Sequence, residues 1–162
     1  MCDYSLMNVP NRLAQEGEEL VAHRFPTGSL GLASPCDVKR PSTARITARP
    51  GLLERIRDFF NPPVAEPVCA VCIPPGARLQ LSDIPPRMQQ EYGVGPSEEV
   101  VFTQITAAVN SYRDAVRFRS GREVRLQELR EGQHIKVLDL SLAEPVDLEQ
   151  IRAREELAYR LR

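Results

Sequence analysis

Residues 114–126 read "DAVRFRSGREVRL", and this stretch decides the fold class. Its large apolar residues alternate with charged ones on both sides of a Ser-Gly pair: Val116, Phe118, Val124 and Leu126. Such alternation is typical of two half-buried strands joined by a turn. Side chains directly opposite one another share a face of the sheet, so all four reach one core only if the loop has an odd number of residues. We therefore predict a β-hairpin with a bulged turn at Ser120-Gly121.

Strand-like segments extend in both directions from this hairpin. The other predicted strands lie within residues 2–9, 19–25, 26–34, 68–73, 77–81, 98–109 and 134–140. In the first of them Cys2, Tyr4 and Leu6 share one face. The Pro-Pro-Gly at 74–76 predicts a hairpin between the strands on either side of it, and residues 11–18 have the composition of a polar connection.

Three segments have helical patterns instead. Residues 52–60, "LLERIRDFF", place their apolar side chains on one side of a helix that the following Asn-Pro-Pro ends. Residues 82–93 contain prolines in a first helical turn and close on Gly93, which predicts a short helix. Residues 146–162 start with an Asp147/Gln150 capping pair and continue as an amphipathic helix.

These elements predict an α+β fold that is mainly β. We expect a small antiparallel, barrel-like sheet with two or three peripheral helices. Residues 1–145 form a single β-rich domain, and residues 146–162 form a C-terminal helix. Residues 34–67 are a proline- and arginine-rich insertion without apolar periodicity, apart from the helix at 52–60.

Composition limits the classes of partner. The chain has 162 residues, a net charge of -1 and 27% charged residues, which fits one soluble domain. No segment resembles a signal peptide or approaches the roughly 18 apolar residues of a membrane span. We therefore expect a cytoplasmic protein that does not associate with membranes.

Basic residues gather in the insertion and on the 114–126 hairpin, which raises the question of nucleic-acid binding. Aromatic residues make up only 6% of the chain, and Phe118 belongs to the apolar face of the hairpin. Glu123, Glu128 and Glu131 lie close to the hairpin arginines in sequence. A solvated face with cross-strand ion pairs is the expectation, and nucleic acid is not an expected partner.

Cys2 follows the initiator methionine and would become an N-terminal nucleophile if Met1 were removed. Such residues serve amide hydrolysis, with the α-amino group as the base. Asp3 stands where the amidotransferases of this kind usually have glycine, and the chain is short for their two-sheet fold. An N-terminal-nucleophile amidohydrolase is therefore a remote alternative.

The other cysteine chemistry concerns metal and redox sites. In a cytoplasmic protein we expect the four cysteines to be free thiols, metal ligands or redox groups rather than a disulfide framework. Cys69 and Cys72 have zinc-knuckle spacing, but on a strand their side chains point to opposite faces. A site of Cys2, Cys72 and His134 would hold zinc or iron if their strands were neighbours. The competing interpretation makes Cys2, Cys69 and Cys72 small buried core residues.

The chain resembles a group of small bacterial proteins that open with "MCDYSL". The likeness rests on that opening, on "AVCIPPG" at 70–76 and on "VRFRSGREVRLQELREGQHIKVL" at 116–138. It covers the N-terminal strands and residues 68–140. The group has no established activity, so the resemblance implies a shared sheet, with the insertion as an elaboration, and it implies no catalytic residues or cofactor.

These observations lead to two functional hypotheses besides the remote one. The sequence contains no phosphate-binding loop, nucleotide fingerprint or catalytic motif. The first hypothesis is a non-enzymatic binding or accessory module that acts through protein contacts, at sheet edges, the 52–60 helix or the terminal helix. The second is a thiolate/imidazole metal-binding or redox protein that uses Cys2, Cys72 and His134.

Overall fold

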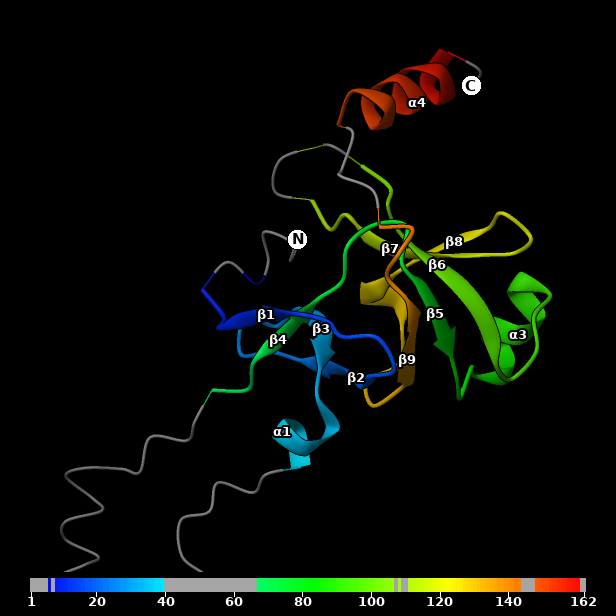
Figure 1. The fold of residues 1–162 in the computed structure, drawn as a ribbon. Coiled ribbons are helices and arrows are strands. Elements are labelled where there is room, and N and C mark those ends of the chain that lie inside the picture. Colours follow the sequence, from blue (N-terminus) through cyan, green and yellow to red (C-terminus); the bar gives the residue numbers. More distant parts are fainter. Residues whose placement is uncertain are drawn as a thin grey trace, which may run out of the picture.

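The computed structural model describes residues 6, 8–39, 67–106, 108, 111–143 and 148–160. Nine strands in these ranges form one sheet, accompanied by short helices (Figure 1). The strands are β1 (Asn11–Leu13), β2 (Glu19–Arg24), β3 (Leu30–Ala33), β4 (Ala70–Cys72), β5 (Arg78–Leu81), β6 (Glu98–Gln104), β7 (Asp114–Phe118), β8 (Glu123–Arg125) and β9 (His134–Asp139). The mainly β, α+β class expected from the sequence is confirmed.

The strand order is β1-β4-β3-β2-β9-β5-β6-β7-β8. Eight strand pairs connect it, and all of them are antiparallel except β1–β4, in which Asn11 is opposite Ala70 and Leu13 opposite Cys72. The sheet is therefore mixed rather than purely antiparallel. Its two outermost strands are β1 and β8, so strand pairing does not close it into a barrel.

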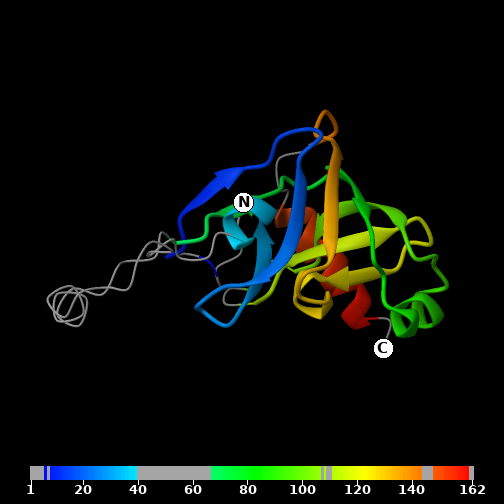
Figure 2. The same ribbon diagram turned by 90° about the horizontal axis from the view of Figure 1, so that it is seen from below.

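The side chain of Gln127 connects the end of the sheet at β8 to strand β3. Gln127 lies in the 3-10 helix η2 (Leu126–Glu128), directly after β8. Its amide accepts a hydrogen bond from the Leu30 N–H at 2.9 Å and donates one to the Leu30 carbonyl at 2.7 Å. Seen from below, the blue strands β2 and β3 cross the yellow-green β7 and β8 steeply, as in a strongly twisted sheet (Figure 2). β8 and β3 do not pair as strands, so the Gln127 amide supplies the hydrogen bonds between these two parts of the sheet.

The core lies inside the curled sheet. Its largest fully buried side chains include Leu20, Leu79, Phe102 and Ile135, all of which lie on central strands. A second, smaller cluster consists of Leu6, Val9, Phe25, Ala33 and Ala70. It lies under β2, β3 and β4, so the N-terminal segment shares in the packing of these three strands.

The hairpin predicted at 114–126 is confirmed, including its bulged turn. Val116 is opposite Val124, and the Phe118 N–H donates to the Arg122 carbonyl at 2.9 Å. Residues 119–121 remain as the loop, which is an odd number. Gly121 has φ 84°, the left-handed conformation that a bulged turn of this kind requires.

The helices are α1 (Pro35–Lys39), α3 (Pro86–Tyr92) and α4 (Leu148–Arg160). For α3 the sequence signals are confirmed, because Pro86 opens the helix and Gly93, with φ 67°, ends it. The C-terminal helix is confirmed in its existence as α4. The predicted helix at 52–60 lies outside the described residues. Among the described residues, no helix is long and apolar enough to span a bilayer.

Two strand predictions are wrong. The strands on either side of Pro-Pro-Gly do not pair, because the Gly76 N–H donates to the Phe102 carbonyl and Phe102 donates back to Ala77, which directs β5 onto β6. In the N-terminal segment Leu6 accepts a turn hydrogen bond from the Val9 N–H at 3.0 Å. A turn therefore replaces the end of the predicted strand 2–9, whose residues 2–5 lie outside the described ranges.

Candidate functional site

The β1 edge, which we define as residues Asn11–Leu13, is the outermost strand on one side of the sheet. The sequence interpretation missed it, because residues 11–18 have a polar composition. Leu13 is 70% exposed, more than any other large hydrophobic side chain in the described ranges. The other outermost strand, β8, has the sequence Glu-Val-Arg and buries its only apolar residue. An exposed apolar side chain therefore distinguishes the β1 edge from the β8 edge.

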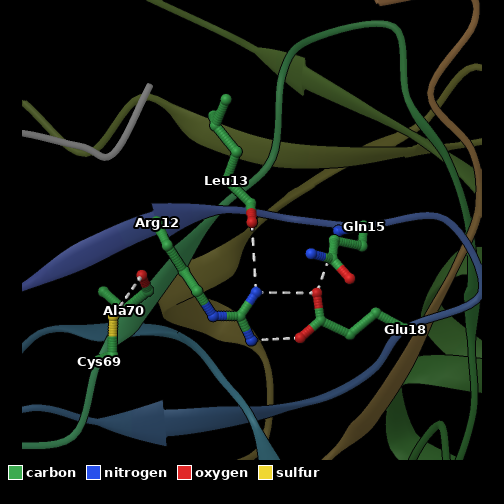
Figure 3. A network of polar contacts seen from close by, with 6 residues as sticks. All are labelled: Arg12, Leu13, Gln15, Glu18, Cys69 and Ala70. Carbon is green, nitrogen blue, oxygen red and sulfur yellow. Dashed lines mark hydrogen bonds and ion pairs between the residues drawn. The ribbon is translucent and has the colours of Figure 1, made fainter.

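A bidentate ion pair fixes the chain next to this edge (Figure 3). Arg12 donates through Nη1 to Glu18 Oε2 at 3.0 Å and through Nη2 to Glu18 Oε1. Arg12 Nη1 also donates to the Leu13 carbonyl at 3.2 Å, and the Gln15 N–H donates to Glu18 Oε2 at 3.0 Å. These contacts join the end of β1 to the last residue of the loop that leads to β2.

The hydrogen bond from Arg12 lowers the pKa of the Glu18 carboxyl, and the same bond raises the pKa of Arg12. Burial of each group opposes these shifts and is the smaller effect. Both partners therefore stay charged at neutral pH, and the positive charge of Arg12 on the edge strand is neutralised by Glu18 of the loop that follows it.

The loop is also attached to β9. The Gly17 N–H donates to the Val137 carbonyl and the Val137 N–H to the Glu18 carbonyl, both at 2.9 Å. The Glu16 carboxylate accepts from the Leu140 N–H at 2.8 Å. Since β9 is a central strand, these bonds join the loop after the β1 edge to the middle of the sheet.

A recess is lined by residues of β3 and β4, Leu30, Leu32, Val71 and Cys72 among them, and by residues of β6, β7 and η2. Its empty volume, open solvent included, is about 350 Å³. Most of the lining residues are apolar. Asp114 adds a carboxylate, 8% exposed, which accepts a hydrogen bond from Gln104 Nε2 at 3.0 Å. Leu6 also lines the recess, so it faces the same space as Val71 and Cys72 of β4.

Cys72 is 6% exposed, lies directly opposite Leu13 of the β1 edge, and is disulfide-bonded. Cys36 and Cys69 are free, so the partner of Cys72 is not among the described residues. Cys36 and Cys69 are thus free thiols, one of the states expected for the cysteines, whereas the sequence did not lead us to expect a disulfide at Cys72. The alternation along β4 revealed its burial but not its bond, because spacing along the chain carries no information on pairing.

The structure does not bring Cys72 and His134 together. His134 begins β9, and β3 and β2 stand between that strand and β4, a separation of about 14 Å at the usual spacing of strands. The His134 side chain is 54% exposed, and its Nδ1 lies 2.7 Å from Asp83 Oδ2. Cys2, the third predicted ligand, lies outside the described residues. No cluster of three or more His, Cys, Asp or Glu suited to a metal occurs within the described ranges.

Asp83, the partner of His134, has φ 56° and is the only described residue other than glycine with a positive φ. The Ser82 N–H donates to the His134 carbonyl at 2.9 Å, so backbone and side-chain contacts tie the two segments together. Sequence reasoning missed this pair because the residues are 51 positions apart. The carboxylate orients the imidazole, and this contact explains the position of His134 without a metal.

The predicted cross-strand pairing of the hairpin arginines is confirmed for Arg117. Its guanidinium lies 2.8 Å from Glu123 of the facing strand and donates to Thr103 Oγ1 at 3.1 Å. A similar pair joins Arg78 to Glu99 at 2.8 Å. Arg117 and Arg78 therefore pair with carboxylates on neighbouring strands of the same sheet.

Comparisons of the chain with models of protein families, with curated proteins and with solved structures found no match.

Proposed function

We propose that this protein is a non-enzymatic binding module that acts through protein contacts, with the β1 edge as its docking surface. The partner is an extended segment of another protein that adds a strand beside β1. Main-chain hydrogen bonds supply affinity in this mode of recognition, and pockets for alternate side chains supply specificity.

The exposed Leu13 is the observation that carries the proposal. Natural sheets protect their edges with charged residues, prolines or very short strands, because an open edge pairs with other chains. β1 and β8 have three residues each, so strand length does not distinguish the two edges. In β8 the two outer residues, Glu123 and Arg125, are charged and Val124 is buried. At the β1 edge the charge of Arg12 is taken up by Glu18, and Leu13 presents its side chain to solvent.

The rigidity of the edge supports the same proposal. A strand that is already held in its bound conformation loses little conformational entropy when a partner binds. The Arg12–Glu18 pair and the bonds of the 15–18 loop to β9 hold β1 in that way. Leu13 therefore serves as an apolar anchor on a fixed backbone.

The test is a quantitative affinity enrichment from cells that make the protein, with isotope-labelled wild type and two variants. Leu13→Gln removes the apolar anchor without adding charge. Leu142→Gln is the matched control, because Leu142 is 59% exposed and lies after β9, outside the β1 edge.

A partner that is recovered with wild type and with Leu142→Gln, and depleted at least about tenfold with Leu13→Gln, is the expected result; tenfold corresponds to about 1.4 kcal/mol of lost contact. Equal recovery with all three proteins, or equal loss with both variants, would remove the support for the β1 edge.

A thiol redox role is the second candidate function, and the disulfide at Cys72 is the observation that favours it. A sulfur in a disulfide has no thiolate to offer a metal, so zinc or iron at Cys2, Cys72 and His134 would require the reduced protein and a rearrangement that brings His134 to β4. Metal analysis of untagged, reduced protein against a Cys2→Ser/Cys72→Ser variant tests the metal-binding form. Equal, sub-stoichiometric metal in both would reject it.

A further inference from the structure

We infer that the β1 edge selects one kind of partner, a short extended segment in which an apolar residue is followed two positions later by a residue other than proline. The segment runs antiparallel to β1 and forms three main-chain hydrogen bonds with it. This inference rests on the proposed function, because it describes the partner that docks at the same edge.

The first step is the direction of the main-chain groups of β1. The Ala70 N–H donates to the Pro10 carbonyl at 2.8 Å, and the Ala14 N–H donates to the Cys72 carbonyl at 3.0 Å. Alternate residues of a strand direct their N–H and carbonyl groups to the same side. Arg12, midway between Pro10 and Ala14, therefore also directs its main chain to β4.

The other two residues of β1, Asn11 and Leu13, direct their main-chain groups to the open side of the strand. The Leu13 carbonyl already accepts a bond from Arg12 Nη1 at 3.2 Å (Figure 3). Among the bonds of the described residues, none uses the Asn11 N–H, the Asn11 carbonyl or the Leu13 N–H. We call these three groups the β1 window.

Local contacts limit the β1 window on both sides. After β1, the Gln15 N–H donates to Glu18 Oε2 at 3.0 Å, and the Gln15 carbonyl accepts from the Glu18 N–H at 3.2 Å. Before β1, the Val9 N–H donates to the Leu6 carbonyl at 3.0 Å, and the Val9 carbonyl accepts from Asn11 Nδ2 at 3.2 Å. A partner strand therefore finds open main-chain groups only in the window between these residues.

The β1 window determines the donors and acceptors that a partner must offer. It presents two N–H donors and one carbonyl acceptor, so the partner supplies two carbonyls and one N–H. In an antiparallel pair one partner residue exchanges both bonds with Asn11, and the residue two positions before it accepts from the Leu13 N–H. Proline has no N–H to donate, so it is excluded opposite Asn11.

The orientation and the apolar position follow from pairing energetics. Antiparallel pairs are slightly more stable per residue than parallel ones. The partner residue opposite Leu13 lies on the same face as the Leu13 side chain, which is 70% exposed. An apolar side chain at that position covers Leu13. A charged one would lose water without gaining a counter-charge, because Glu18 already pairs with Arg12, the basic residue of β1.

Amide hydrogen exchange of the free, full-length protein tests the β1 window by itself. The N–H groups of Asn11 and Leu13 face the open side, whereas those of Arg12 and Ala14 face β4. After correction for intrinsic rates, we expect exchange at Asn11 and Leu13 to be at least about tenfold faster than at Arg12 and Ala14. Equal protection of all four amides would overturn the inference.

Selection of linear peptides from a random display library on the full-length protein tests the partner pattern. Peptides that bind wild type and lose affinity for Leu13→Gln are assigned to the β1 edge. We expect these peptides to share an apolar residue followed two positions later by a residue other than proline. Binding of one such peptide should slow amide exchange at Asn11 and Leu13.

Two variants of Asn11 measure the contribution of its N–H. Asn11→Pro removes one donor of the β1 window and retains the bonds to β4, in which this N–H takes no part. Asn11→Ala is the matched control, because it also lacks the side chain but keeps the N–H. We expect a selected peptide to bind Asn11→Pro about three- to tenfold more weakly than Asn11→Ala, the loss of one hydrogen bond.

The outcomes separate this inference from the proposed function. Peptides that depend on Leu13 but bind Asn11→Pro and Asn11→Ala equally, or that lack the pattern, would overturn the inference and leave the docking surface in place. If no selected peptide depends on Leu13, the docking surface and the inference fail together. The exchange measurement uses wild type alone, so it decides on the window even if a variant does not fold.

Discussion

Gly31 shows how one residue sets the packing of the N-terminal segment. A Cβ at this position would lie 2.6 Å from Leu6 Cδ1 and 3.0 Å from the Phe25 ring. No positive φ is involved, so the requirement for glycine is purely steric. The close approach allows Leu6 and Phe25 to cover β3 in the smaller core cluster.

We expect Gly31→Ala to destabilise the protein by about 1–3 kcal/mol, because Leu6 and Phe25 must move in a packed core. Equilibrium denaturant unfolding measures this free energy. Gly95→Ala is the control, since its Cβ would meet nothing closer than 3.5 Å. Equal unfolding free energies for the two variants would contradict the packing described for Leu6.

The Arg12–Glu18 pair makes a pH-dependent contribution at the residue scale. The pKa of Glu18 is lower in the folded than in the unfolded protein, so its stabilisation is complete above the unfolded value of about 4.3 and is lost as the pH falls through the folded value. Glu18→Gln should cost about 0.5–1 kcal/mol at pH 7.

The cost of Glu18→Gln should shrink as the pH falls below about 4. Urea unfolding at pH 7 and at about pH 3 measures it, with Glu19→Gln, which removes an exposed carboxylate of β2, as the reference. A cost that is unchanged at low pH would show that the ionised pair is not its source.

The hairpin 114–125 is the element whose structure the sequence predicted in most detail. Its apolar alternation is local information, and the parity of the loop follows from it. Gly121→Val forces a β-branched residue to φ 84° and should cost about 1–2 kcal/mol. Thermal unfolding checks this value, and Ser120→Val in the same loop is the comparison. A cost for Ser120→Val as large as that for Gly121→Val would argue against the bulged turn.

The contact between η2 and β3 is the element-scale feature that the sequence did not reveal. In Gln127→Leu the buried N–H and carbonyl of Leu30 lose both partners, which should cost about 2–3 kcal/mol. Amide hydrogen exchange locates the effect, because Leu30 should exchange much faster in the variant. Gln90→Leu, an exposed position on α3, is the control. Unchanged exchange at Leu30 would show that Gln127 does not bridge the gap in the sheet.

At the scale of the whole molecule, the sequence predicted what depends on neighbouring residues. The mainly β class, α3 with its Pro86 start and Gly93 end, and most strands follow from periodicity and turn residues. Strand pairing depends on contacts far apart in sequence. The parallel β1–β4 pair and the separation of β4 from β5 were therefore outside the reach of local patterns.

The same reason applies to the candidate site. Alternation predicted that Cys72 is buried, but its disulfide, the Asp83–His134 contact and the Arg12–Glu18 pair each depend on tertiary placement. The exposed Leu13 follows from the position of β1 at the end of the strand order. The docking surface therefore becomes visible only at the scale of the complete sheet.

The central claim is that a partner protein docks at the β1 edge, and site-specific photo-crosslinking from that edge tests it most directly. A photoreactive phenylalanine analogue replaces Leu13 in one sample and Leu142 in another, both exposed positions of the described chain. After irradiation of producing cells, the account predicts a discrete covalent adduct from position 13 that is absent from position 142. No adduct at either position, or the same adducts at both, would contradict it.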